Sequence, residues 1–167
     1  MDFFGCVESR HSFRSYKSDQ VEDEKLESIL EAARVAPTAA NRQPFRILVI
    51  RTEGRGAELR RIYDKEWFVA APLVLLVCSV PADAWVRKDG KNYADVDATI
   101  VMDHMVMAAT SLGLGTCWIA AFDAQAAREA LKLDPRWEPL VFTPLGYATE
   151  TPAPRPRKAL ADIVVRL

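Results

Sequence analysis

Stretches in which apolar residues recur with a helical period alternate along the chain with short, almost wholly apolar runs. The period of Leu26, Ile29 and Ala33 predicts a helix from Glu22 to Val35 that ends before Pro37. Apolar runs rich in β-branched residues predict buried strands. The other predicted helices are Phe3 to Ser9, Gly56 to Lys65 with a weaker period, Asp95 to Leu112 and Ala124 to Leu131, and the predicted strands are Phe45 to Ile50, Leu73 to Ser79, Thr116 to Ile119, Leu140 to Gly146 and Asp162 to Leu167.

The order of these elements favours the α+β class. Helices and strands alternate too irregularly for a repeated βαβ series, and the chain contains no internal repeat. Its 167 residues, half of them apolar and 27% charged, are enough for one globular domain spanning residues 1–167.

The stretch from Asp95 to Leu112 is the most strongly apolar of the predicted helices. Val96, Ile100, Val101 and Met105 cover more than one of its faces, so the helix must be buried on several sides. Two interpretations are open at this point: a central core helix, or a helix at a subunit interface.

Charge and composition exclude several classes of protein. The net charge of −1 gives no overall attraction to nucleic acid. The longest apolar run, Leu73 to Cys78, is too short to span a membrane. The N-terminus lacks the pattern of a signal peptide, so we expect a cytoplasmic protein. Three widely spaced cysteines and two distant histidines predict neither a disulfide framework nor a metal site, and the cysteines are expected to be buried apolar residues.

Arg10-His11-Ser12-Phe13-Arg14 places two guanidiniums, an imidazole and a hydroxyl within five residues. Arginine binds phosphate oxygens through paired N–H groups, and a serine hydroxyl can add a further donor. The pentapeptide therefore indicates a phosphate site. Taken alone, it also fits a solvated basic turn with Arg14 in a surface ion pair.

Two further motifs lie in predicted connections. Small residues followed by Asn41 and Gln43 form a polar surface that suits the edge of a heterocycle, although a turn bracketed by Pro37 and Pro44 is the simpler interpretation. Gly113-Leu114-Gly115 ends the apolar helix, where two glycines permit a left-handed cap and a close backbone approach. A phosphate loop would need further glycines and a lysine, which are missing.

Taken together, these motifs resemble the FMN-dependent nitroreductase family. The resemblance extends in order over nearly the whole chain. It rests on Arg10-His11-Ser12-x-Arg14, Ala36-Pro37-Thr38-Ala39-x-Asn41-x-Gln43-Pro44-Phe45, Gly113-Leu114-Gly115-Thr116-Cys117-Trp118-Ile119, Pro144-Leu145-Gly146-Tyr147 and Arg155-x-Arg157-Lys158. It implies a central, mostly antiparallel sheet flanked by helices, with the C-terminal segment exchanged across a homodimer.

The resemblance also implies which residues hold FMN. Arg10, His11, Ser12 and Arg14 would meet Arg155 and Arg157 on the phosphate and ribityl chain. Pro37, Thr38, Ala39, Asn41 and Gln43 would line the flavin and ribityl, with residues 37–39 reaching across from the other subunit. Trp118, Ile119, Ala120 and Ala121 would lie against the ring, with an N–H, best placed at Ala120, bonded to flavin N5; Trp118 as a core residue is the alternative. Contacts to the flavin pyrimidine between Ile50 and Leu73 are left unassigned.

The implied activity is an NAD(P)H oxidoreductase with two half-reactions at one site. NADH or NADPH passes hydride to flavin N5, and a nitroaromatic, a quinone or a similar electron-poor acceptor then takes the same place. Flavin and water can supply the protons, so no catalytic side chain is named. The alternatives are an FMN-binding protein with little turnover, or a family member that carries out reductive dehalogenation or flavin-linked oxidation. Membranes and nucleic acids are not expected partners.

Overall fold

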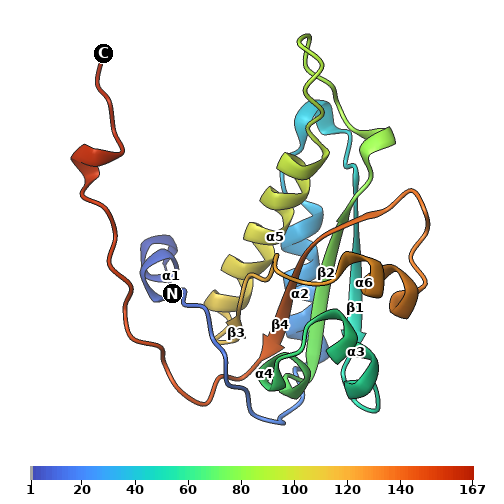
Figure 1. Ribbon diagram of the computed structural model, residues 1–167. Coiled ribbons are helices and arrows are strands. Elements are labelled where there is room, and N and C mark those ends of the chain that lie inside the picture. The colour runs from blue at the N-terminus through green and yellow to red at the C-terminus, as the bar shows by residue number, and fades with distance from the viewer. Residues whose placement is uncertain (1) are drawn as a thin grey trace.

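The computed structural model describes residues 2–167 and contains a four-stranded sheet with helices on both faces (Figure 1). Every neighbouring pair of strands is antiparallel. The predicted α+β class and the antiparallel sheet are therefore confirmed. The strands lie in the order β1 (Phe45–Arg51), β2 (Leu73–Ser79), β4 (Glu138–Gly146) and β3 (Gly115–Thr116).

The helices match most of the predicted positions. The α-helices are α1 (Phe3–Ser9), α2 (Asp23–Arg34), α3 (Gly56–Ile62), α4 (Glu66–Ala70), α5 (Ala94–Ser111) and α6 (Ala124–Leu131), and the short 3-10 helices are η1 (Ala39–Asn41), η2 (Pro81–Asp83) and η3 (Leu160–Asp162). The C-terminal end predicted for the helix from Gly56 to Lys65 is wrong. The helix ends at Ile62, because the chain is extended at Tyr63 and Lys65, and a separate helix, α4, follows.

Two hydrophobic cores lie on the two faces of the sheet, and β2 contributes to both. Successive strand residues point to opposite faces. Leu73, Leu75 and Val77 accordingly pack with α2 and α5. The alternate residues of β2 pack with α3, α4 and α6. Every residue of β2 is buried, as its unbroken apolar run predicts.

Helix α5 lies within the first of these cores. Val101, Met102 and Met105 are at most 1% exposed, and the helix packs against α2 and the sheet. The burial of this stretch in the core is confirmed, while its place at a subunit interface stays a prediction.

Two predicted strands need correction. The strand from Thr116 to Ile119 is only two residues long, because the N–H of Cys117 donates to the Thr143 hydroxyl instead of continuing the ladder, which returns as one bridge at Ile119. The strand predicted from Asp162 to Leu167 is wrong. The segment begins in η3 and continues without a pairing partner among residues 2–167, and unpaired backbone forms no strand.

Other features bear on the predicted class of protein. No helix within residues 2–167 combines the length and the apolar character needed to cross a membrane. All three cysteines are free and buried, as expected. The cytoplasmic location and the lack of a nucleic-acid partner stay predictions.

Candidate functional site

The N-terminal basic motif is held beside the short strand β3. Ser12 forms a parallel bridge with Thr116, whose carbonyl accepts the N–H of Phe13 at 2.9 Å. A side chain at Gly115 would place its Cβ 3.1 Å from the Phe13 ring, so glycine is what allows this close approach. Gly113, with φ of 76°, ends α5 in the left-handed region. Both roles predicted for these two glycines are confirmed.

A second backbone contact brings the C-terminal tail, residues 150–167, to the same place. Beyond Phe13, Tyr16 forms an antiparallel bridge with Ala148. The N–H of Lys17 donates to the Tyr147 carbonyl at 2.8 Å, and the N–H of Thr149 donates to the Ser15 carbonyl at 3.3 Å. We call this pairing of residues 15–17 with residues 147–149 the terminal ribbon. Because of it, the tail starts directly beside the basic motif.

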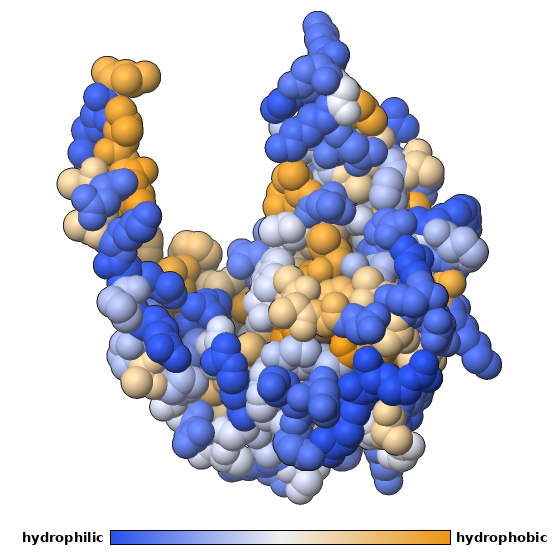
Figure 2. Space-filling view, in the orientation of Figure 1, coloured by the Kyte–Doolittle hydropathy of each residue, from blue (hydrophilic) through white to orange (hydrophobic). Residues whose placement is uncertain are grey.

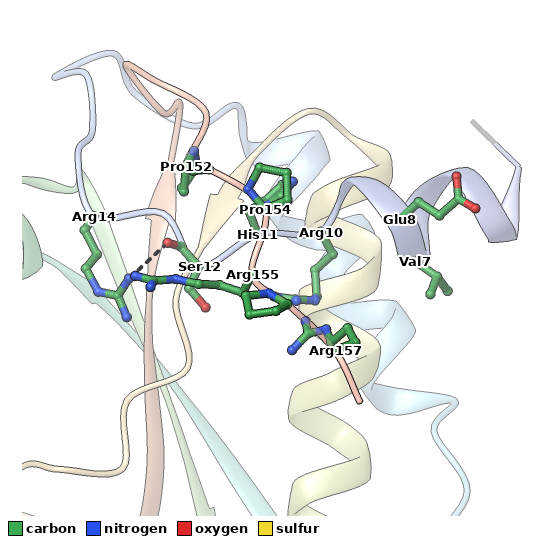
Figure 3. Close-up of a pocket in the computed structure, with 12 residues that line it drawn as sticks. Val7, Glu8, Arg10, His11, Ser12, Arg14, Pro152, Pro154, Arg155 and Arg157 are labelled. Carbon is green, nitrogen blue, oxygen red and sulfur yellow. Dashed lines mark hydrogen bonds between the residues drawn. The ribbon is translucent and has the colours of Figure 1, made fainter. Parts of the chain in front are cut away.

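The motif and the tail together enclose a groove of about 920 Å³. Figure 3 shows the side chains of Arg10, Arg14, Arg155 and Arg157 gathered on this opening, together with Ser12 of the basic motif. We call these four side chains the arginine cluster. The structure thus brings together all six residues predicted for the phosphate. The full lining is Val7, Glu8, Arg10, His11, Ser12, Arg14, Pro152, Ala153, Pro154, Arg155, Pro156 and Arg157.

The arginine cluster carries uncompensated positive charge. None of its guanidiniums lies within 4.0 Å of a carboxylate in the described chain, whereas most other arginines pair with Asp or Glu. Arg14 makes one long hydrogen bond, 3.4 Å, to the Ser12 carbonyl. Glu8 is the only carboxylate in the lining. Because like charges held together repel, this arrangement favours an anionic ligand. Within the described residues, Arg14 does not form the surface ion pair that the alternative interpretation assigns to it.

Behind the groove, Cys117 offers no nucleophile. Burial raises the pKa of its thiol, while Arg14, the Ser12 hydroxyl and Arg10 act in the opposite direction with smaller effect. The thiol is therefore protonated at neutral pH, and a thiol is a poor nucleophile compared with a thiolate.

The residues predicted around the flavin ring are not part of the groove in one chain. Pro37, Thr38, Ala39, Asn41 and Gln43 lie on and around η1, beyond the C-terminal end of α2. The opposite end of α2 adjoins the terminal ribbon, where Glu22 accepts the Tyr147 hydroxyl at 2.7 Å. A helix of 12 residues separates the two ends by roughly 18 Å.

The η1 segment has an unusual backbone conformation that is stabilised by side-chain hydrogen bonds. Ala40, Asn41 and Gln43 have φ values of 51–52°, which are strained for residues other than glycine. The buried Asp97 carboxylate accepts the Ala39 N–H at 2.9 Å, and the Thr38 hydroxyl accepts the Gln43 N–H at 3.1 Å. The Gln43 amide also donates to the Asn41 side chain at 3.2 Å. These three hydrogen bonds hold the segment in its left-handed conformation.

The segment after β3 is placed differently from residue to residue. Ile119 is 3% exposed and packs in the second core, and its backbone N–H donates to Phe142, so neither its side chain nor its N–H is available to a ligand. Trp118 is 41% exposed, which rules out the interpretation of it as a core residue. Ala120 and Ala121 are exposed, and the Ala120 N–H donates to no acceptor in the described chain.

Trp67 is a residue near the groove that the sequence did not reveal. The Arg14 guanidinium carbon lies 5.8 Å from the centre of the Trp67 ring. Trp67 lies on α4, just after the stretch from Gly56 to Lys65 whose helical period is weak, and no motif marks it. The tail prolines that line the groove are the other missed contribution; their repeated spacing at 152, 154 and 156 was the available signal.

Comparison with known proteins gives one consistent result. The model of the nitroreductase family matches residues 7–72 and 63–147. The chain is 37% identical to a nitroreductase family protein of Clostridium difficile 630 of known crystal structure. The two structures superpose with a TM-score of 0.89 over 99% of this chain and 98% of the other. It is 27% identical to an NADH dehydrogenase of Thermus thermophilus over 93% of this chain and 91% of that protein. It is 28% identical to an FMN reductase [NAD(P)H] of Bacillus subtilis over 87% of this chain and 66% of that protein.

Proposed function

The chain belongs to the nitroreductase family, and we propose that it uses FMN, held in the groove, to reduce nitroaromatics, quinones or similar electron-poor acceptors with electrons from NADH or NADPH. One observation carries this proposal. Arginines from opposite ends of the chain, none with a carboxylate partner within residues 2–167, converge on one opening. Relatives named NADH dehydrogenase and FMN reductase [NAD(P)H] support NAD(P)H-dependent oxidoreduction.

The residues of the groove fit the phosphate of FMN. A phosphomonoester carries close to two negative charges at neutral pH and three acceptor oxygens. The arginine cluster supplies four guanidiniums, and the Ser12 hydroxyl is a further donor at the same opening. The groove volume of about 920 Å³ also falls within the range of roughly 300–1,000 Å³ found for small-molecule sites.

When bound, FMN supplies an atom, N5, that accepts hydride from the nicotinamide and returns it to the acceptor. The protein contributes binding and orientation. The arginine cluster fixes the phosphate end. The Ala120 N–H, which has no acceptor in the described chain, is free to donate to the ring edge at N5. The exposed Trp118 side chain provides an apolar surface against the ring.

A second copy of the chain completes the site in this proposal. The groove opens beside the terminal ribbon at one end of α2, and η1 lies beyond the other end of this helix, whose 12 residues span roughly 18 Å. No η1 residue lines the groove of its own chain, so in this proposal the η1 residues that meet the flavin come from the partner subunit. The surface supports a homodimer, because α1 exposes Phe3, Phe4 and Val7. An exposed group of large apolar side chains is typical of an interaction surface.

The tail is the segment that we propose to be exchanged. Figure 1 shows it standing away from the body, and Figure 2 shows a hollow between the two. Leu160, Ile163 and Val165 are 66%, 63% and 83% exposed. In the described chain β1 pairs only with β2, so its outer edge is open. An apolar, β-branched tail that finds no strand partner within residues 2–167 fits a surface on a second copy.

Anaerobic titration of the FMN-loaded protein with NADH and with NADPH tests the activity. Rapid loss of the visible flavin absorbance, followed by its return on addition of a quinone or nitroaromatic, is the expected result. A yellow protein that neither nucleotide reduces would instead be an FMN-binding protein without turnover. A preparation that takes up no FMN on reconstitution would refute the proposal.

Analytical ultracentrifugation tests the dimer. Full-length protein is expected to sediment as a dimer. A chain that stops after Ala159 keeps Arg155 and Arg157 but loses the apolar end of the tail, so we expect weaker dimerisation and weaker FMN binding together. A full-length monomer with stoichiometric FMN would contradict the shared site.

A further inference from the structure

Within residues 2–167, Trp67 is the aromatic residue that makes a cation–π contact with the arginine cluster. Its ring centre lies 5.8 Å from the guanidinium carbon of Arg14, within the range of about 6 Å over which a cation is attracted to an aromatic face. Arg14 is an exposed side chain with a single hydrogen bond, and that bond is 3.4 Å long. The contact with Trp67 is therefore one of two interactions that the described chain offers to the Arg14 side chain.

Trp67 is itself held firmly. It packs edge-to-face on Tyr63, with ring centres 5.6 Å apart and an interplanar angle of 74°. Tyr63 packs in the same way on Phe68, and Phe68 on Phe142 at 5.9 Å. Phe68 and Phe142 are fully buried in the second core. The Trp67 ring is therefore anchored through a continuous series of aromatic contacts to the central sheet.

The far end of this series lies beside the segment that follows β3. Phe142 exchanges two backbone hydrogen bonds with Ile119, at 2.9 and 3.0 Å. Ile119 directly precedes Ala120, the residue whose N–H we place at the flavin ring. The same aromatic series thus contacts both the side chain assigned to the phosphate and the segment assigned to the ring.

From this geometry we infer that Trp67 is a positioning residue for the cofactor, which holds the Arg14 guanidinium at the groove so that it is ordered before the FMN phosphate arrives. The inference rests on the proposed function, because the phosphate is the ligand that Arg14 would meet. The physical basis is conformational entropy. A free arginine side chain must lose its rotamer freedom when it binds, and a guanidinium already held on an aromatic face loses less.

The test compares FMN with riboflavin, which lacks the phosphate. Both are titrated into flavin-free protein, and Kd is measured from the change in flavin fluorescence. Trp67→Met keeps a flexible apolar side chain of useful volume but removes the aromatic face. We expect Trp67→Met to weaken FMN binding about fivefold and Trp67→Phe about twofold, since tryptophan offers a cation the best face, and we expect no change for riboflavin.

A double-mutant cycle assigns the effect to Arg14. Arg14→Met removes the guanidinium, so adding Trp67→Met to it should cause no further loss of FMN affinity. Trp85→Leu is the matched control, because Trp85 packs edge-to-face on Tyr93 with centres 5.1 Å apart and is not part of the groove. This control should bind FMN as the wild type does.

Three results would overturn the inference. Equal losses for FMN and riboflavin would show that Trp67 supports the site only structurally, and additive losses in the cycle would show that it does not act through Arg14. If Trp67→Met unfolds too readily to titrate, Trp67→Phe decides alone, and wild-type FMN affinity in that variant rejects the inference. The proposed function fails separately, if the wild-type chain itself binds no FMN.

Discussion

Gly146 is the position where the structure predicts the largest effect of adding one methyl group. It lies at the end of β4, opposite Gly115 of β3. A Cβ added there would lie 2.7 Å from Cδ and 3.2 Å from Cγ of Pro72, and 3.4 Å from the Tyr16 ring. Carbon atoms normally approach to about 3.5–4.0 Å, so Gly146→Ala creates an overlap of roughly 0.8 Å with the proline ring.

The overlap cannot be relieved by a side-chain rotation. Pro72 is a rigid ring, its carbonyl accepts the Thr52 N–H at 3.2 Å, and the next residue, Leu73, pairs with Leu145. Relief requires the ends of β2 and β4 to move apart. Overpacking of this kind costs about 1–3 kcal/mol. Because the contact is with backbone-linked atoms in a sheet, we expect about 2–3 kcal/mol.

Thermal unfolding of the flavin-free protein, followed by circular dichroism at one fixed protein concentration, measures the cost. For a chain of this size, 1 kcal/mol corresponds to about 2–4 °C in Tm, so Gly146→Ala should lower Tm by about 5–10 °C. Gly56→Ala is the control. Gly56 begins α3, no atom lies within 4 Å of the added Cβ, and alanine favours the helix, so Tm should stay equal or rise slightly. A Tm for Gly146→Ala within 1 °C or so of the wild type would refute the reasoning.

Three further predictions concern the groove, the flavin-facing segment and the buried thiols. Arg14→Ala removes one charge-assisted phosphate contact, so FMN should bind at least about tenfold more weakly with little change in Tm. Flavin titration measures the affinity and a thermal melt measures Tm. Unaltered FMN affinity would count against the phosphate assignment. Trp118→Ala alters an exposed side chain, so we expect the free energy of unfolding to change by less than about 0.5 kcal/mol while FMN affinity falls, and a large loss of stability without FMN would contradict its place at the ring. Burial raises the pKa of the Cys78 thiol to about 12 from 9.0. Above pH 9 the folded state therefore keeps a proton that the unfolded chain releases. The contribution of this thiol to the free energy of unfolding is full below pH 9 and falls as the pH rises above it. Denaturant titrations under reducing conditions between pH 8 and 10.5 should show this loss, and Cys78→Ala should reduce its slope; identical slopes would refute it.

The sequence predicts most of the fold because its elements are encoded locally. The unbroken apolar run of β2 and the many-sided apolar character of α5 both require burial, and both elements are central in the structure. The glycines at 113 and 115 were interpretable for the same reason, since a left-handed cap and a close approach leave few alternatives to glycine.

The errors arise where a local pattern depends on a distant partner. The residues from Asp162 onward have the composition of a strand, yet a strand forms only on another strand, and none is available within residues 2–167. No local sequence pattern marks Trp67, because its contact with Arg14 joins residues 53 positions apart in the sequence. The η1 segment could be assigned a chemistry but not a place at the groove, since one chain keeps the two apart.

The terminal ribbon also determines when the groove can exist during synthesis. Residues 15–17 leave the ribosome early, but their partners at 147–149 and the arginines at 155 and 157 follow only after the whole sheet has been made. At about 5–20 residues per second, the N-terminal arginines wait for roughly 7–28 seconds before the tail joins them. A nascent or truncated chain that stops before residue 155 therefore lacks half of the arginine cluster, and tight FMN binding would distinguish finished chains from unfinished ones.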